Sequence, residues 1–251
     1  YFSILPVIIM RKSRKPVIIA SRGMLNPQAF SVKRTKKKMF LKLSKVFGLY
    51  NKVSFHATNT DEAHYIKSIL GKETNVKIAP NLPRRFAANF LTTKVKHKPV
   101  RFINVARISR EKGTLKMLNA IAQINSPLVL DIYGPVYDTV YWEQCRSVIK
   151  RLPSFIEVNY KGTLASENVP STLASYDFFV LLSEGENFGH AILEALSVGL
   201  PVLISNLTPW KNLEKQFLGW DIDTGNQDKI IVFRIFTNFC YEMKTSDTNT
   251  T

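Results

Sequence analysis

Residues 183–205, with the sequence SEGENFGHAILEALSVGLPVLIS, contain the pattern that decides the fold. The apolar run DFFVLL precedes them at 177–182, and their last six residues, LPVLIS, form a second apolar run. Between the two runs, a turn with two glycines leads into residues 190–199, whose apolar positions have helical spacing. Strand, turn, helix and strand in this order predict two parallel strands joined by a helix.

The same alternation runs through the second half of the chain. Apolar runs predict strands at 100–106, 127–134, 155–162, 177–183 and 201–205. Helical periodicity follows each of them, at 113–124, 140–152, 169–176, 190–199 and 209–218. Regular alternation with short connections predicts an α/β, Rossmann-like domain whose parallel sheet is covered on both faces. Such domains bind ligands beyond the carboxyl ends of their strands.

The first half of the chain carries a shorter version of this pattern. Strands are expected at 15–21, 52–59 and 75–81, with a helix at 31–50 and another that starts at an N-cap, Thr60. We therefore expect a first domain at 1–82, a linker at 83–99, a second domain at 100–222 and a truncated or divergent segment at 223–251. The chain begins at Tyr1 inside an apolar segment, so we expect a fragment whose first domain is truncated at its N-terminus.

The charge is distributed unevenly between the two halves. Residues 1–99 hold 21 Lys and Arg against three acidic residues, a net charge of +18, whereas residues 100–251 carry a net charge of −2. All six lysines in the helix at 31–50 lie within residues 33–45, opposite its apolar positions. A solvated helix face and an anionic membrane leaflet, or a lipid-diphosphate acceptor, are both open interpretations. No nucleic-acid partner is expected, because no binding motif or aromatic platform accompanies the charge.

The composition excludes several classes of protein. Two cysteines, Cys145 and Cys240, cannot form a disulfide framework or a metal cage by themselves. The longest apolar runs are too short to span a bilayer. We expect a cytoplasmic protein, with peripheral attachment to the inner face of the membrane as a further possibility.

Candidate binding residues gather at the predicted carboxyl edge of the second sheet. Glu186 lies in the turn after one strand, and Glu194 lies on the following helix with seven residues between them. The backbone N–H groups of Asn187, Phe188 and Gly189 stand where that helix begins and can point at an anion or at sugar hydroxyls.

Two cations and two glycines belong to other strand ends of the same domain. Arg107 and Lys112 follow its first strand and can neutralise a diphosphate without a metal ion. Gly134 and Gly162 end the next two strands, where glycine is also a common turn former.

The order of these pieces resembles the retaining nucleotide-sugar glycosyltransferases of family four, or glycosyl transferases group 1. The resemblance covers about residues 17 to 222 and rests on Arg107, Lys112, Gly113, Gly134, Gly162, SEGENFGHAILEA and GLPVL. It implies the GT-B fold of two Rossmann-like domains with parallel sheets. It also implies transfer of a hexose or similar sugar from a nucleotide diphosphate to a carbohydrate or lipid-linked acceptor, in polysaccharide, lipopolysaccharide or glycolipid synthesis.

The resemblance also implies roles for individual residues. Glu194 would accept hydrogen bonds from the ribose hydroxyls, and Glu186 would contact the transferred sugar. Arg107 and Lys112 would grip the diphosphate and stabilise the charge of the departing nucleotide. Gly134 and His190 would complete the donor site, and neither a cofactor nor a metal ion is expected.

Two departures from that family leave alternatives open. Its glycine-rich loop near the start of the first domain has no counterpart here, and its helical C-terminus is short or absent after Gly219. A non-catalytic module that binds nucleotide sugar or a membrane, and a related GT-B nucleotide-sugar epimerase, are therefore the alternatives. Asp221 and Asp223 match an Asp-any-Asp metal motif by chance, and His56 and His64 are taken as packed or surface residues.

Overall fold

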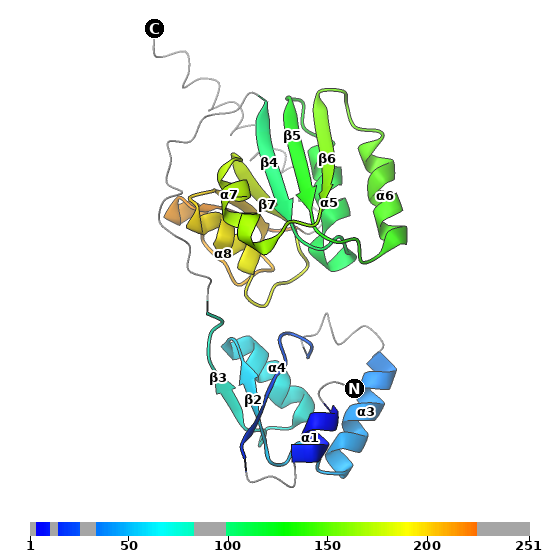
Figure 1. Ribbon diagram of the computed structural model, residues 1–251, viewed down its shortest axis with the longest axis vertical. Coiled ribbons are helices and arrows are strands. Elements are labelled where there is room, and N and C mark those ends of the chain that lie inside the picture. The colour runs from blue at the N-terminus through cyan, green and yellow to red at the C-terminus, as the bar shows by residue number, and fades with distance from the viewer. Residues whose placement is uncertain (1–3, 11–14, 26–33, 83–98, 225–251) are drawn as a thin grey trace. The chain divides into compact units, whose positions relative to one another are not determined.

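The computed structural model describes residues 4–10, 15–25, 34–82 and 99–224, which form two compact units (Figure 1). The first unit ends at Leu82 and the second begins at Pro83. The predicted linker, apart from Pro99, and residues 225–251 of the predicted C-terminal segment lie outside the described residues.

Within the described residues of the first unit, β1, β2 and β3 form a parallel sheet in this order, and three helices pack with it. Its elements are α1 (Ile4–Met10), β1 (Val17–Ala20), α3 (Arg34–Val46), β2 (Val53–Ala57), α4 (Thr60–Leu70) and β3 (Val76–Ile78). Alternate residues of β2 are buried, and they pack with Ile66 of α4 and Val7 of α1 in one core. The predicted N-cap of α4 is off by one residue, because the side chain of Asn59 accepts from the backbone N–H of Glu62.

The second unit is a six-stranded parallel sheet in the order β6-β5-β4-β7-β8-β9. Its strands are β4 (Val100–Val105), β5 (Leu128–Tyr133), β6 (Ile156–Gly162), β7 (Phe178–Leu181), β8 (Val202–Ser205) and β9 (Gly219–Ile222). Its α-helices are α5 (Thr114–Ile121), α6 (Thr139–Ile149), α7 (Val169–Ala174) and α8 (His190–Ser197). The prediction of parallel sheets is confirmed.

Successive residues of the central strands feed two separate cores, as the period of two in a strand requires. Phe178 and Val180 of β7 pack with α5 and α6, whereas Phe179 and Leu181 pack with α7 and α8. Figure 1 shows these two pairs of helices on opposite sides of the sheet. The near-continuous apolar runs in the sequence therefore reflect strands buried on both faces.

The predicted helix at 209–218 is wrong. That segment contains only a short 3-10 helix, Glu214–Gln216, and then enters the edge strand β9. The carboxylate of Asp221 on β9 accepts from the backbone N–H of Leu213 at 2.9 Å, which holds the preceding turn in place. Gly219 permits this close return, because a Cβ there would lie 1.9 Å from the carbonyl oxygen of Val202.

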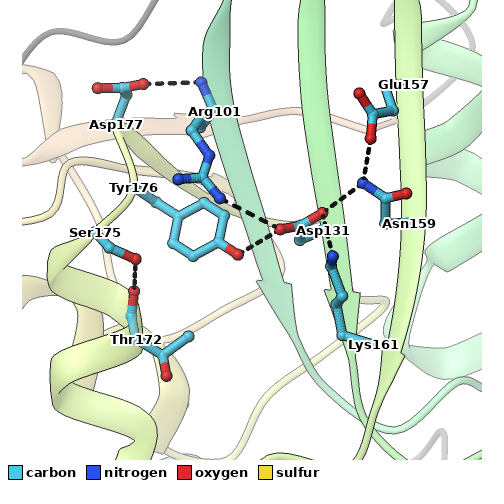
Figure 2. Close-up of polar contacts among 9 residues, drawn as sticks. All are labelled: Arg101, Asp131, Glu157, Asn159, Lys161, Thr172, Ser175, Tyr176 and Asp177. Carbon is cyan, nitrogen blue, oxygen red and sulfur yellow. Dashed lines mark hydrogen bonds and ion pairs between the residues drawn. The ribbon is translucent and has the colours of Figure 1, made fainter.

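A polar cluster around the buried carboxylate of Asp131 connects the strands on the face covered by α7 (Figure 2). Asp131, in the middle of β5, accepts from the Tyr176 hydroxyl at 2.5 Å and from Asn159 at 3.0 Å. Arg101 and Lys161 lie 3.6 and 4.0 Å from the same carboxylate. Burial, together with the hydrogen bond to Asp131, raises the pKa of Tyr176, which keeps this phenol a hydrogen-bond donor. Asp131 is thus the common partner of side chains from β4, from β6 and from the residue pair before β7, and it ties these segments together.

No described helix has the length and apolar character needed to cross a bilayer.

Candidate functional site

In the second unit, the order in which strands are added to the sheet reverses between β4 and β7. From β4 the chain continues through β5 to β6 on one side, and it then returns to place β7 on the other side of β4. The chain therefore leaves the carboxyl end of β4 toward α5 on one face of the sheet, and it leaves the carboxyl end of β7 toward α8 on the other face. In doubly wound sheets this switch point is the position at which ligands bind.

The two loops are packed tightly against each other. The backbone N–H of Glu184, after β7, donates to the carbonyl oxygen of Glu111, after β4, at 2.8 Å. Gly113 has a φ of 68°, and a Cβ at this position would lie 1.9 Å from the carbonyl oxygen of Leu182. Glycine is required here both for its left-handed backbone and for the close approach of the two loops.

Lys112 and Glu186 bridge the switch point directly. The Nζ atom of Lys112 donates to Oε1 of Glu186 at 2.6 Å, although 74 positions separate the two residues. The side chains are only 19% and 11% exposed. The structure thus brings together two of the predicted site residues, and it presents an ammonium group and a carboxylate side by side in a partly desolvated position.

Arg107 is not part of this pair in the structure. Its guanidinium pairs with Glu111 at 3.0 Å and lies 5.2 Å from the centre of the Tyr137 ring. Arg107 and Glu111 are about half exposed, and such an ion pair contributes little to stability. The Arg107 side chain is therefore free to turn toward a ligand at small cost.

A hydrogen bond from the segment after β8 holds the turn at 187–189 in place. The indole Nε1 of Trp210, in the segment after β8, donates to the carbonyl oxygen of Phe188 at 2.7 Å. Gly189 then adopts a φ of 76° as the residue before α8, and a Cβ there would lie 2.8 Å from Ile192. Trp210 is a site residue that the sequence patterns did not predict, and the only signal for it is an aromatic residue shortly after a strand end.

Two predicted donor-site residues lie on α8 and a third at the end of β5. His190 is exposed at the first position of α8, with its ring 4.8 Å from that of Phe188, and Glu194 is half-buried one turn further on. Gly134 has a φ of 141°, and a Cβ there would lie 1.9 Å from the carbonyl oxygen of Ala106. Gly134 therefore allows the end of β5 to approach the loop that leads to Arg107.

Unsatisfied polar atoms gather at the same edge of the sheet. Among the described residues, four buried side-chain oxygens have no hydrogen-bond partner, and they belong to Asn104, Ser109, Ser183 and Asn206. All four residues lie at or just after the carboxyl ends of β4, β7 and β8. Each buried polar atom without a partner destabilises the fold by about 1–3 kcal/mol. Several such atoms at one place are typical of a binding site.

Two buried titratable side chains of α6, Tyr141 and Cys145, have raised pKa values. Burial raises the pKa of Tyr141 to about 12, and its hydroxyl oxygen accepts from the backbone N–H of Leu115 at 2.8 Å. Burial also raises the pKa of the Cys145 thiol to about 11, which excludes a reactive thiolate at neutral pH. Within the part of the chain that the structure describes, no three His, Cys, Asp or Glu side chains gather as metal ligands.

The other weak signals of the sequence have structural explanations. Asp221 is committed to the backbone of Leu213, as described above. Nε2 of His56 lies 2.8 Å from the carbonyl oxygen of Ala79, and His64 is an exposed residue of α4.

Comparison with known proteins identifies relatives for most of the chain. Residues 88–231 match the family model described as glycosyl transferases group 1. O-antigen chain mannosyltransferase B of Escherichia coli is 33% identical over 93 residues, which is 37% of this chain and 23% of that protein. N-acetyl-alpha-D-glucosaminyl L-malate synthase of Bacillus anthracis is 24% identical over 174 residues, 62% of this chain and 44% of that protein. The matched segments therefore span less than half the length of either relative.

A solved structure shares the fold. The crystal structure of HepE from Anabaena in complex with UDP-glucose has a TM-score of 0.71 and 19% sequence identity, and it covers 96% of this chain and 67% of that protein.

Proposed function

The chain belongs to the glycosyl transferases group 1 family and has its GT-B fold class, and from this premise we propose that it transfers a sugar from a nucleotide-diphosphate donor to an acceptor hydroxyl with retention of anomeric configuration. The observation that carries the proposal is the Lys112–Glu186 ion pair at the switch point between β4 and β7. There, one cation and one carboxylate meet the demands of a donor that carries both a diphosphate and sugar hydroxyls.

The donor groups divide among the site residues by charge. Lys112 binds the diphosphate through the ammonium N–H groups that do not donate to Glu186. Arg107 breaks its ion pair with Glu111 and binds the same diphosphate. Glu186 accepts a hydrogen bond from a hydroxyl of the transferred sugar. Glu194 accepts from the ribose, while the N–H groups of 187–189 and His190 contact the sugar or phosphate.

The transfer step requires charge stabilisation more than an additional base. The bond from the anomeric carbon to the diphosphate oxygen breaks, and a bond from that carbon to the acceptor oxygen forms on the same face. The acceptor proton passes to the departing phosphate oxygen. Lys112 and Arg107 stabilise the negative charge that develops on that phosphate, so they act where the transition state differs from the bound donor.

The two units have different roles in this proposal. The second unit, from residue 100 to 222, binds the donor, and the first unit, to residue 82, faces the acceptor. The acceptor is a carbohydrate or a lipid-linked sugar in polysaccharide, lipopolysaccharide or glycolipid synthesis at the inner face of a membrane. The name of the O-antigen mannosyltransferase relative supports this acceptor class.

Calorimetry with a panel of UDP-, GDP- and ADP-sugars tests the donor site. We expect one of the donors to bind, and Lys112→Ala to weaken that binding by roughly 10- to 150-fold, the effect of losing a charge-assisted hydrogen bond of about 1.5–3 kcal/mol. Lys150→Ala is the matched control, because it removes an exposed positive charge of the same unit from the end of α6. If wild type and Lys112→Ala bind the nucleotide sugar with equal affinity, Lys112 does not contact the donor.

Turnover separates the transferase from a module that only binds. A donor that binds and is consumed in the presence of acceptor supports transfer, and a product with inverted configuration contradicts retention. Binding without turnover across acceptors favours the non-catalytic alternative.

A further inference from the structure

Helix α3 carries apolar side chains on a face that its own unit does not bury. Met39 is 63% exposed, Leu43 is 50% exposed and Val46 is 74% exposed. The spacing of four and then three residues aligns them along one side of the helix, and we call them the apolar stripe. The helix instead packs through Phe40, Leu41 and Ser44.

Three exposed lysines form a second stripe on the same helix. Lys38, Lys42 and Lys45 repeat the same spacing, and we call them the lysine stripe. At about 100° per residue, the lysine stripe lies about 100° around the helix axis from the apolar stripe. The helix contains no acidic residue. Figure 1 shows α3 at the margin of its unit, beside α1.

The two stripes together specify an anionic and apolar partner. A second copy of the chain does not fit, because residues 1–99 carry a net charge of +18 and equal lysine stripes repel each other. An anionic lipid surface does fit, since a helix of 13 residues is about 20 Å long and a planar interface contacts both stripes along all of it.

We propose that α3 docks in the plane of an anionic lipid surface, with the apolar stripe inserted at the level of the acyl chains and the lysine stripe against the headgroups. The lysines supply attraction that salt screens, whereas the apolar stripe supplies binding that salt does not screen. That this surface delivers a lipid-linked acceptor rests on the proposed function, but the docking itself does not.

Vesicle co-sedimentation of the whole chain tests the docking. The probes are vesicles of phosphatidylcholine alone and vesicles that also contain phosphatidylglycerol. We expect wild type to bind the anionic vesicles strongly at low salt and to keep part of this binding at high salt. The triple variant Lys38→Gln, Lys42→Gln, Lys45→Gln should bind roughly a hundredfold more weakly at low salt, about fivefold for each lysine.

The apolar stripe has its own variant. Leu43→Gln with Val46→Gln should weaken binding by more than about tenfold and should abolish the part that survives high salt. The control for the lysine variant is the triple variant Lys67→Gln, Lys72→Gln, Lys77→Gln of the same unit. The control for the apolar variant is the double variant Ile78→Gln, Leu82→Gln. All of these control positions are exposed and lie outside α3, so we expect wild-type binding.

Each contrary outcome overturns the proposal in a different way. If the apolar variant binds as wild type does, the attraction is electrostatic alone and the helix does not insert. If wild type is oligomeric and the apolar variant is monomeric, the stripe is a protein interface. In calorimetry, the same variants should bind the nucleotide-sugar donor as wild type does. If wild type binds vesicles but no nucleotide sugar, the proposed function is rejected and the docking proposal stands.

Discussion

A single buried carboxylate, Glu62, ties together the ends of two strands in the first unit. Its Oε1 accepts from the Ser21 hydroxyl at 2.6 Å and from the Gly23 backbone at 2.7 Å, both after β1. Its Oε2 accepts from the backbone and hydroxyl of Thr58, after β2, at 2.8 and 2.7 Å. Between Ser21 and Gly23, Arg22 takes a left-handed backbone with a φ of 47°. The four bonds therefore hold a loop conformation that a non-glycine residue does not adopt readily.

These bonds make the stability of the first unit depend on pH. Burial by itself would raise the pKa of Glu62, but the hydrogen bonds from Ser21, Thr58 and Gly23 outweigh it and lower the pKa from 4.5 to about 2. A lowered pKa stabilises the fold above the unfolded value of 4.5, and this stabilisation, on the order of 3 kcal/mol, is lost as the pH falls toward 2.

Urea unfolding of wild type and Glu62→Gln across pH 2–7 measures this contribution. We expect a difference in the free energy of unfolding of roughly 3 kcal/mol at neutral pH that narrows between about pH 4.5 and pH 2. Glu73→Gln, which changes an exposed carboxylate of the same unit, serves as the control. A difference that does not vary with pH would mean that Glu62 acts through its shape and not through its charge.

Donor binding should survive EDTA. Lys112 already stands at the switch point and Arg107 lies in the same loop, and the described residues contain no three-residue cluster of metal ligands. Calorimetry of the donor with and without EDTA, and then with added Mg²⁺ or Mn²⁺, measures the effect. A strict requirement for the metal would contradict the assignment of the diphosphate grip to these two cations.

At the scale of the elements, the site depends on how closely the loops after β4 and β7 approach each other. Gly113→Ala should lower the free energy of unfolding by about 2–5 kcal/mol. This is the sum of about 1–2 kcal/mol for an alanine in the left-handed conformation and about 1–3 kcal/mol for the overlap with Leu182. Gly162→Ala is the control: Gly162 has a similar φ of 74°, but a Cβ there meets nothing within 4 Å, so only the first cost applies.

Thermal or urea unfolding of both alanine variants separates the two costs. We also expect Gly113→Ala to weaken donor binding, because moving the loop separates Lys112 from Glu186. Equal destabilisation in the two variants would show that backbone conformation alone, and not the contact between the loops, requires glycine at position 113.

At the scale of the whole molecule, the two units have separate cores and different charges. The second unit buries two hydrophobic clusters, one on each face of its six-stranded sheet, and both consist of its own residues. Residues 1–82 carry 16 Lys and Arg against three acidic residues, a net charge of +13, whereas residues 83–251 carry 19 against 16, a net charge of +3. Folding and donor binding should therefore be properties of the second unit, and attraction to anionic lipid a property of the first.

Expression of residues 83–251 alone tests this separation. We expect this piece to unfold cooperatively, to bind the same nucleotide sugar as the whole chain and to lose attraction to anionic vesicles, because it lacks α3. Circular dichroism, calorimetry and co-sedimentation report the three properties. Loss of donor binding in a piece that still folds would mean that the first unit contributes to the donor site.

Much of this architecture could be predicted from the sequence because its causes are local. Buried parallel strands require apolar runs, and their covering helices require apolar residues every three to four positions, so the alternation from Val100 onward predicted the strands β4 to β8 and the helices between them. Parallel strands end at one edge of a sheet, which predicted that Lys112 and Glu186 follow strand ends on the same side.

The prediction of residues 209–218 failed for a reason that is not local. Their periodicity is compatible with a helix, but β9 pairs with β8 through the close approach that Gly219 permits, and Asp221 then fixes the turn before it. The pairing of β9 with β8, which the periodicity of 209–218 does not reflect, overrode the local preference.

By itself, the sequence determined the class of fold, the location of the positive charge and the residues available at the strand ends. Only the tertiary structure decided that β4 lies beside β7, which joins Lys112 to Glu186 across 74 positions, and that the apolar stripe of α3 faces outward. Periodicity follows from the backbone geometry of a few neighbouring residues. Strand order and burial follow from which distant surfaces pack together, and that choice is a property of the whole chain.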